Sequence, residues 1–141
     1  MQIKLEALSA SLGKSLLPIY LIGGEDPWLT QDATNTIYNA AKKQHFRPQS
    51  TQYIEKDSQW SELIQSAQNG SLFDDKKLYK LSLKKNTISK AGQAILSQFA
   101  ERMDTILLIQ CQKFSAADKK AVWFKKINTF STIIDIWPLF P

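Results

Sequence analysis

The chain has 141 residues, 43% of them hydrophobic and 22% charged, and its 18 lysines and arginines against 13 acidic residues give a net charge of +5. These values are typical of one soluble globular domain with a full core. The single cysteine, Cys111, excludes an internal disulfide framework. No stretch approaches ~18 consecutive apolar residues, so we expect no membrane span. Without an apolar N-terminal run, we expect no signal peptide and a cytosolic protein.

The first part of the chain predicts a helix, a strand and a second helix. Apolar residues at helical spacing predict a first helix that stops at Gly13; they are Ile3, Leu5, Leu8 and Leu12. Residues 18–24, PIYLIGG, predict a buried strand. Asp26 and Pro27 then suit the N-cap and first position of a helix that runs to about Gln44. Its predicted inward residues are Leu29, Ala33, Ile37, Ala40 and Ala41.

The same alternation continues to the end of the chain. Further strands are predicted at residues 50–55, 76–83, 105–111 and 131–137. Between them we predict a helix from Asp57 or Ser58 to the Asn69-Gly70 turn, one at 89–103, and one short helix at 115–127. The predicted inward residues of the first two are Trp60, Leu63, Ile64 and Ala67, then Ala91, Ala94, Ile95, Phe99 and Ala100.

Strict alternation of strands and helices predicts the fold class. Parallel strands with right-handed crossovers follow from it, which gives a doubly wound α/β fold with a mostly parallel five-stranded sheet and helices on both faces. The run at 105–111 is the most apolar and is expected near the sheet centre. After the last strand, Leu139 and Phe140 either pack back on the core or mark a domain cut from a longer chain.

The residue types that usually build catalytic centres give no catalytic or metal site. His45 is the only histidine, and we expect it in a solvated position after a helix. With one histidine and one cysteine, the usual zinc ligands cannot be assembled. Cys111 is expected to be a small buried residue. We expect the three tryptophans that fall on helices at apolar phase in the core, namely Trp28, Trp60 and Trp123.

The glycines after the first strand stand where an α/β nucleotide-binding fold holds phosphate. A P-loop needs G-x-x-x-x-G-K-[ST], but the sequence from Gly23 to Pro27 is GGEDP, with no lysine and two carboxylates. Pro27 also removes a backbone donor. The tripeptide at residues 13–15, GKS, precedes the strand and lacks the first glycine. The loop therefore predicts a degenerate nucleotide site and no bound cofactor.

Hydrolysis of a nucleotide would also need a carboxylate that holds magnesium at the end of a neighbouring strand. The strand at 76–83 is followed by Lys84 and Lys85, which carry the wrong charge. Asp135 in the last strand is a weak substitute. We therefore expect no ATP hydrolysis.

The stretch QNGSLF, from Gln68 to Phe73, puts two large apolar residues directly after a turn signal. Leu72 and Phe73 either enter the core at the start of the next strand or face outward as a docking element. In the second interpretation they fill an apolar pocket on a partner, while the amide of Gln68 is free to hydrogen-bond that partner. The sequence alone leaves both interpretations open.

Several motifs in order resemble the delta subunit of the DNA polymerase III clamp loader. The chain carries PIYLIGGEDPWLTQDA at 18–33, then a tryptophan-containing helix and SLF at 57–73, and later TILLIQCQKFSAADKKAVWF at 105–124. Each motif is loose, but their order and spacing are fairly specific. Gln-x-x-Ser-Leu-Phe also resembles the element by which bacterial replication proteins bind the sliding clamp.

The resemblance implies a fold similar to AAA+ ATPases without a working nucleotide site, and a domain with no catalytic activity of its own inside a DNA polymerase complex. It implies that Leu72 and Phe73 anchor the sliding clamp (the beta subunit), with Ser71 and Gln68 as lesser contacts, and that binding helps to open the ring. Residues 1–141 would be the N-terminal domain, without the family's lid and collar, which join the other clamp-loader subunits.

Two other functions stay open from the residues. A P-loop-like ATPase domain would bind ATP with magnesium. A basic nucleic-acid-binding domain would bind through the positive excess, but the lysine pairs are scattered, so we expect only weak or indirect contact with DNA.

Overall fold

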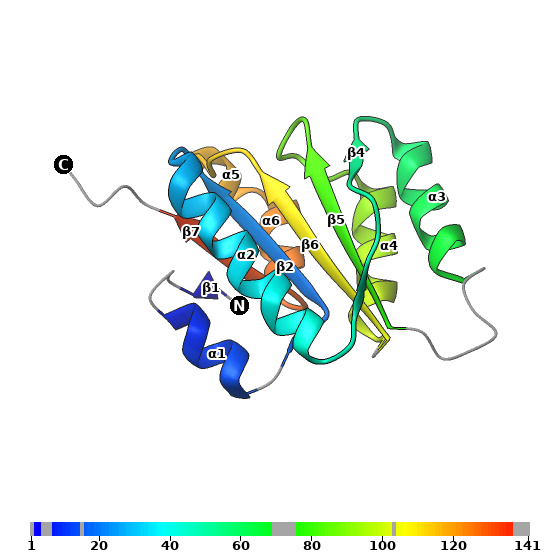
Figure 1. The fold of residues 1–141 in the computed structure, drawn as a ribbon. Helices are drawn as coiled ribbons and strands as arrows, with labels where there is room; N and C mark the ends of the chain where they lie inside the picture. Colours follow the sequence, from blue (N-terminus) through cyan, green and yellow to red (C-terminus); the bar gives the residue numbers. More distant parts are fainter. Residues whose placement is uncertain (1, 4–6, 15, 69–75, 103, 137–141) are drawn as a thin grey trace.

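The computed structural model describes residues 2–3, 7–14, 16–68, 76–102 and 104–136 (Figure 1). Its strands are β1 (Gln2–Ile3), β2 (Ile19–Gly24), β3 (Arg47–Pro48), β4 (Gln52–Ile54), β5 (Lys77–Leu83), β6 (Thr105–Cys111) and β7 (Thr132–Ile136). Its helices are α1 (Leu8–Lys14), α2 (Pro27–Lys43), α3 (Asp57–Gln68), α4 (Lys90–Ala100), α5 (Ala116–Lys120) and α6 (Val122–Asn128).

The strands form one sheet in the order β1-β7-β2-β6-β5-β3, with β4 also paired to β5, and every pairing is parallel. This confirms the predicted α/β class and the parallel sheet. β6 lies between β2 and β5, and six of its seven residues are buried. The apolar run at 105–111 is therefore central, as expected.

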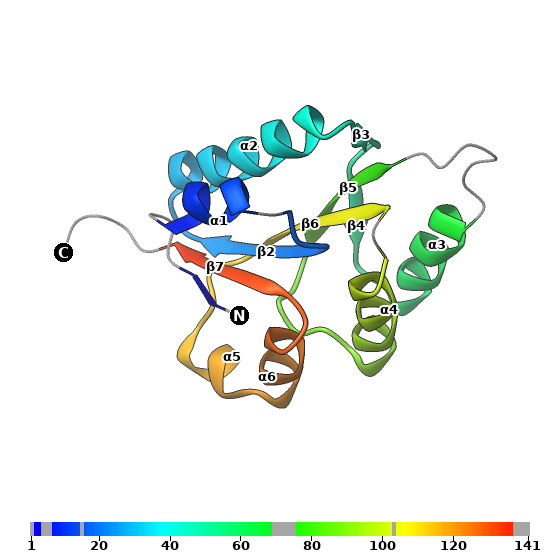
Figure 2. The ribbon, with the colours of Figure 1, turned by 90° about the horizontal axis from the view of Figure 1, so that it is seen from below.

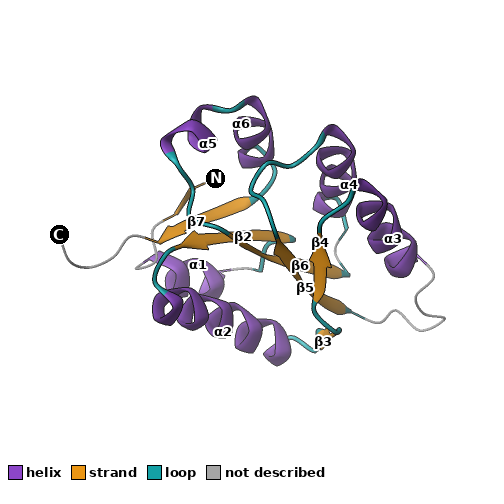
Figure 3. Cartoon of the chain, turned by 90° about the horizontal axis from the view of Figure 1, so that it is seen from above, coloured by secondary structure: helices purple, strands orange, loops and turns teal. Residues whose placement is uncertain are grey.

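Helices cover both faces of the sheet, which confirms the doubly wound arrangement. Figures 2 and 3 show α1 and α2 on one face and α3 to α6 on the other. Each face has its own buried cluster: Tyr20, Ile37 and Leu108 lie in the one beneath α2, and Leu63, Phe99 and Ile109 in the one beneath α3 and α4. Within the described ranges, no helix is long and apolar enough to cross a membrane.

Local signals placed the second and third helices correctly. Asp26 caps α2, which begins at Pro27 and ends at the C-cap Gln44. Ala33, Ile37 and Ala41 are buried on its inner face, and Leu29 and Ala40 pack against the same cluster. On α3, all four predicted inward residues are buried: Trp60, Leu63, Ile64 and Ala67.

The number of strands was predicted wrongly, whereas the N-terminal helix is present and buries Leu8 and Leu12 as expected, but starts later and ends one residue later than predicted. The described part of the sheet has seven strands instead of five, because β1 and β3 are two-residue strands too short to show a repeat. Ile3 belongs to β1 and pairs with Ile134, so it is not helical. Gly13 does not end α1, which continues to Lys14.

Three further predictions on the helices were wrong. The region 115–127 forms two helices, because Ala121 is extended, with φ −70° and ψ 150°. On α4, Phe99 is buried and Ile95 and Ala100 pack against the core as predicted, but Ala91 and Ala94 are exposed and Leu96 takes the inner face. Trp60 and Trp123 are buried as expected, but Trp28 is 84% exposed. It lies on the face of α2 opposite the buried Ile37, in line with the exposed Asp32. This leaves a large aromatic ring on the surface.

Candidate functional site

The two glycines that end β2, Gly23 and Gly24, pack closely against other parts of the chain. A Cβ at Gly23 would lie 2.5 Å from the ring of Phe114 and 2.9 Å from the carbonyl oxygen of Gln112. A Cβ at Gly24 would lie 2.8 Å from the Cβ of Ile136. No described glycine has a positive φ. Close packing against Phe114, Gln112 and Ile136 therefore accounts for both glycines without a bound phosphate.

The N-terminus of α2 is occupied in the same way. The Asp26 carboxylate accepts hydrogen bonds from the backbone N–H of Trp28 at 2.9 Å and of Leu29 at 3.3 Å. Pro27 has no N–H to offer. A helix N-terminus binds phosphate through these donors and its partial positive charge. Here a carboxylate already takes both.

Two further carboxylates near this loop are paired with lysines. Glu25 lies 3.2 Å from the ammonium of Lys113, and Asp135 lies 2.5 Å from that of Lys119. Asp135, the only candidate for a magnesium carboxylate in the last strand, therefore has a lysine partner. In the part of the chain that the structure describes, no three His, Cys, Asp or Glu residues form a group that could hold a metal.

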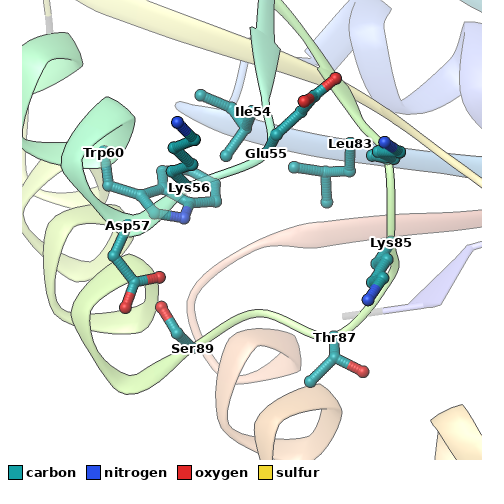
Figure 4. A pocket seen from close by; sticks show the side chains of 10 residues that line it. Ile54, Glu55, Lys56, Asp57, Trp60, Leu83, Lys85, Thr87 and Ser89 are labelled. Atoms are coloured by element: carbon teal, nitrogen blue, oxygen red, sulfur yellow. The ribbon is translucent and has the colours of Figure 1, made fainter.

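A cavity of about 150 Å³ lies where β4 and β5 end (Figure 4). Its apolar floor is formed by Ile54, Trp60 and Leu83, and its charged rim by Lys56, Lys84, Lys85, Glu55 and Asp57. Lys84 and Lys85 thus stand at the end of β5, as the sequence indicates. No carboxylate follows that strand directly.

Cys111 and His45 are not arranged as a catalytic pair. Cys111 is the last residue of β6 and is buried, and burial raises the pKa of its thiol, with a smaller contribution from Asp118. His45 is exposed and follows the C-terminal end of α2, where its backbone has φ 70°. Both predicted positions are confirmed, and a buried thiol with a raised pKa is a poor nucleophile.

The second candidate region is the connection between α3 and β5, which carries QNGSLF. Both of its ends are held. Arg102 donates from Nη2 to the carbonyl oxygen of Ala67 at 3.3 Å, in the last turn of α3. At the start of β5, Lys77 N donates to the carbonyl of Asp104 at 2.9 Å, and Arg47 N donates to that of Lys76 at 2.8 Å.

Arg102 is itself fixed by a carboxylate. Its Nε lies 3.1 Å from Asp104 Oδ1, and its Nη2 lies 3.3 Å from Oδ2. The hydrogen bond from Arg102 lowers the pKa of Asp104, opposed by partial burial and assisted by Thr105. The pair therefore ties the end of α3 to the start of β6.

The predicted clamp-contacting residues stand between these anchors. Gln68 is the last residue of α3. Ser71, Leu72 and Phe73 lie outside the described residues, so the choice between a core position and an outward docking element stays a prediction.

Sequence reasoning missed the residues that support both regions. Arg102 and Asp104 follow α4 without any spacing signal that would link them to α3. Asn86 is buried and donates to the carbonyls of Gln112 and Lys113, so it holds the loop that carries Phe114. From the sequence alone, an asparagine shortly after a strand predicts only a turn.

Comparison with known families decides the identity of the fold. The profile of the family described as "DNA polymerase III, delta subunit" matches residues 20–136, well over half of the chain. The chain belongs to the DNA polymerase III delta subunit family. The matched range includes the loop after β2 and the connection between α3 and β5.

Curated delta subunits match at the level of sequence. The chain is 30% identical over 128 residues to the DNA polymerase III subunit delta of Haemophilus influenzae, and this covers 89% of the chain and 37% of that protein. It is 29% identical over 121 residues to the Escherichia coli subunit delta, covering 84% of the chain and 35% of that protein. The chain thus spans little more than a third of the length of these delta subunits.

Solved structures support the same fold. The Bacillus subtilis DNA clamp loader delta protein (YqeN) superposes with a TM-score of 0.65 at 16% identity, over 93% of this delta-family chain and 42% of that protein. Saccharomyces cerevisiae RIF2 superposes with a TM-score of 0.58 at 11% identity, over 96% and 56%. At these identities the likeness concerns the fold alone.

Proposed function

We propose that this chain is the clamp-binding part of a clamp-loader delta subunit. Leu72 and Phe73 are the anchors that enter a hollow on the sliding clamp, and Ser71 and Gln68 make lesser contacts. The observation that carries the proposal is the delta-family match over residues 20–136, which includes the QNGSLF segment. The protein acts in the cytoplasm, and the parts of delta relatives that this chain does not cover join the other clamp-loader subunits.

The anchored ends of the segment support this role. The hydrogen bond from Arg102 to Ala67 and the pairing of Lys77 with Asp104 fix the points between which residues 68–76 run. A docking element held at both ends loses less conformational entropy on binding than a free peptide. We also propose that the domain is similar in fold to AAA+ ATPases.

Energetics indicate that the two anchors need help from the surrounding surface. Burial of Leu72 and Phe73 contributes ~1.5–3 kcal/mol each, whereas a micromolar complex requires ~8 kcal/mol. The remainder must come from neighbouring contacts. The net charge of +5 also favours approach to an acidic ring.

Ring opening needs no nucleotide chemistry in this chain. A domain that binds the open clamp more tightly than the closed one shifts the population toward the open form. Close packing at Gly23 and Gly24 and the capped N-terminus of α2 are compatible with a domain that binds the clamp without binding a nucleotide.

Titration of the purified sliding clamp from the same organism tests the proposal. The double variant Leu72→Ala/Phe73→Ala should weaken binding by about two to four orders of magnitude, from the burial term of the two side chains. The matched control is Trp28→Ala/Val122→Ala, which removes two apolar side chains that are 84% and 80% exposed elsewhere. The control should bind like the wild type.

Thermal unfolding separates the two interpretations of the segment. If the Leu72→Ala/Phe73→Ala variant unfolds at a much lower temperature than the control, both side chains belong to the core and the docking role is refuted. Equal clamp affinity of the two double variants would refute it as well.

A further inference from the structure

One half of a sheet face has no helix over it. Figure 1 shows α2 in front of β2, and Figure 2 shows α1 and α2 on that side and the remaining helices on the other. The edge of α2 reaches β6, where Gln110 Nε2 donates to Thr34 Oγ1 at 3.2 Å, and no helix covers the later part of β5. The register places Gln110, Ser82 and Tyr53 side by side on β6, β5 and β4. They share the face of Ile22, which α2 covers.

We call this region the open half-face. It consists of Tyr53 on β4, Lys80 and Ser82 on β5, Gln110 on β6, and Tyr38 and Lys42 on α2. Its side chains are polar or aromatic, whereas the same sheet face beneath α2 is apolar. Tyr53 is 65% exposed. The change from apolar to polar residues along one face marks where solvent or a ligand replaces a helix.

Two ammonium groups flank one aromatic ring on this surface. Lys80 Nζ lies 4.4 Å from the centroid of the Tyr38 ring, and Lys42 Nζ lies 5.3 Å from it. Among the described residues, neither lysine forms a salt bridge. A third ammonium, that of Lys76, lies at the start of β5 near the ring of Phe46. The half-face therefore presents positive charge without a paired carboxylate.

The composition favours nucleic acid over a protein partner. The centre of a protein interface is depleted in lysine and serine and enriched in apolar residues, but here the centre is Lys80, Ser82 and Gln110. Lysines on the same surface as an exposed aromatic ring instead suit a strand with anionic phosphates and planar bases. Glu62 on α3 borders Tyr53 from the far side of β4, which limits the positive surface to the α2 side.

We propose that the open half-face binds single-stranded nucleic acid. Lys42 and Lys80, with Lys76 beyond them, hold backbone phosphates, and the exposed ring of Tyr53 stacks on an unpaired base. Between the two, Ser82 offers its hydroxyl and Gln110 its amide oxygen, since the Gln110 Nε2 donates to Thr34 Oγ1 at 3.2 Å. Stacking requires a free base face, so a duplex is a poorer ligand. This role is independent of Leu72 and Phe73.

Fluorescence anisotropy of the full chain with labelled oligothymidylate and oligouridylate of about ten nucleotides tests the proposal. Affinity should fall with salt at a slope of about −0.7 for each phosphate contact. Lys42→Gln/Lys80→Gln should therefore reduce the magnitude of the slope by about 1.4. Lys125→Gln/Lys126→Gln removes the same charge from exposed lysines on α6, across the sheet, and should keep the wild-type slope.

A second pair of variants tests stacking. Tyr53→Ala should weaken binding at least about fivefold, the lower end of what one stacked base contributes. Trp28→Ala removes a more exposed ring at the carboxyl edge and should have no effect. Unlabelled single strand should displace the probe at lower concentration than a duplex of the same length. If Lys80 proves necessary for folding, Lys42→Gln against Lys125→Gln repeats the charge comparison.

Several results would overturn the proposal. Equal losses from the two lysine pairs would mean general charge attraction, and a duplex that competes equally would exclude stacking. Loss of clamp binding in Lys42→Gln/Lys80→Gln, with oligonucleotide binding unchanged, would make the half-face a protein interface. The clamp proposal is tested separately, because Leu72→Ala/Phe73→Ala should retain oligonucleotide binding.

Discussion

Gly23 shows how one missing methyl group sets the packing at the carboxyl edge. Its Cα faces the buried ring of Phe114 and the backbone of Gln112, and an added Cβ would clash with both. Since backbone cannot shift as easily as the end of a side chain, the clash has no cheap relief.

Gly23→Ala should therefore lower the free energy of unfolding by about 1–3 kcal/mol, the usual cost of overpacking. Gly13 is the matched control, because a Cβ there meets nothing within 4 Å and the residue lies in α1. Gly13→Ala should stabilise the chain by about 0.4–1 kcal/mol. Denaturant unfolding of both variants measures the difference. If Gly23→Ala and Gly13→Ala had the same free energy of unfolding, the close packing around Gly23 would be contradicted.

Asp104 gives the fold a dependence on acid pH. The hydrogen bond from Arg102 lowers the pKa of Asp104 below its ordinary 3.8. A carboxyl with a lowered folded pKa stabilises the fold above its unfolded pKa, and this contribution is lost as the pH falls through the folded pKa. The side chain is half exposed, so solvent screening keeps the contribution to about 0–1 kcal/mol.

Asp104→Asn should make the stability profile below pH 4 shallower than that of the wild type. Arg102→Ala should have the same effect, because it removes the partner that shifts the pKa. The double variant should change the profile no more than either single one. Thermal unfolding between pH 2 and 6 measures this. Additive changes in the double variant would contradict the pairing.

At the scale of elements, strong local signals predicted α2 and α3, and tertiary contacts decided the rest. Asp26-Pro27 placed the start of α2, and the stripe from Trp60 to Ala67 placed the inner face of α3. Trp28 lies on the face of α2 opposite the buried Ala33 and Ile37, so its predicted core position was a wrong assignment of phase. The hydrogen bond from Arg102 to α3 joins residues 35 positions apart, a link that no local pattern carries.

The sequence predicted those features of the candidate site that depend on neighbouring residues, but not those that depend on tertiary contacts. The missing lysine and the two carboxylates after Gly23 indicated a degenerate nucleotide loop. That Phe114 fills the loop depends on the fold, because Phe114 follows a different strand. For Leu72 and Phe73 the turn signal leaves two positions open, which clamp titration and thermal unfolding of the double variant separate.

The first turn of α2 should bind ATP with magnesium no more tightly than about 1 mM, which corresponds to ~4 kcal/mol. Asp26 holds the two N–H donors that a phosphate would need, and like charge repels the anion. Isothermal titration with MgATP measures this. Saturable binding well below 1 mM would contradict the degenerate site and favour a P-loop-like ATPase.

The loop after β2, the connection between α3 and β5, and the open half-face lie at different places on the sheet. The filled glycine loop lies at the carboxyl edge of the sheet, where β2 ends, whereas the connection between α3 and β5 leads into the opposite edge, where β5 begins. The open half-face lies between them on the side of α2.

Hydrogen–deuterium exchange of the chain, with and without saturating sliding clamp, tests the central claim most directly. Amides of residues 69–75 should become protected when the clamp binds, because we propose that Leu72 and Phe73 enter its surface. Amides around Trp28 and Val122 should exchange at unchanged rates. Unchanged exchange at 69–75 in a chain that binds the clamp would contradict the account.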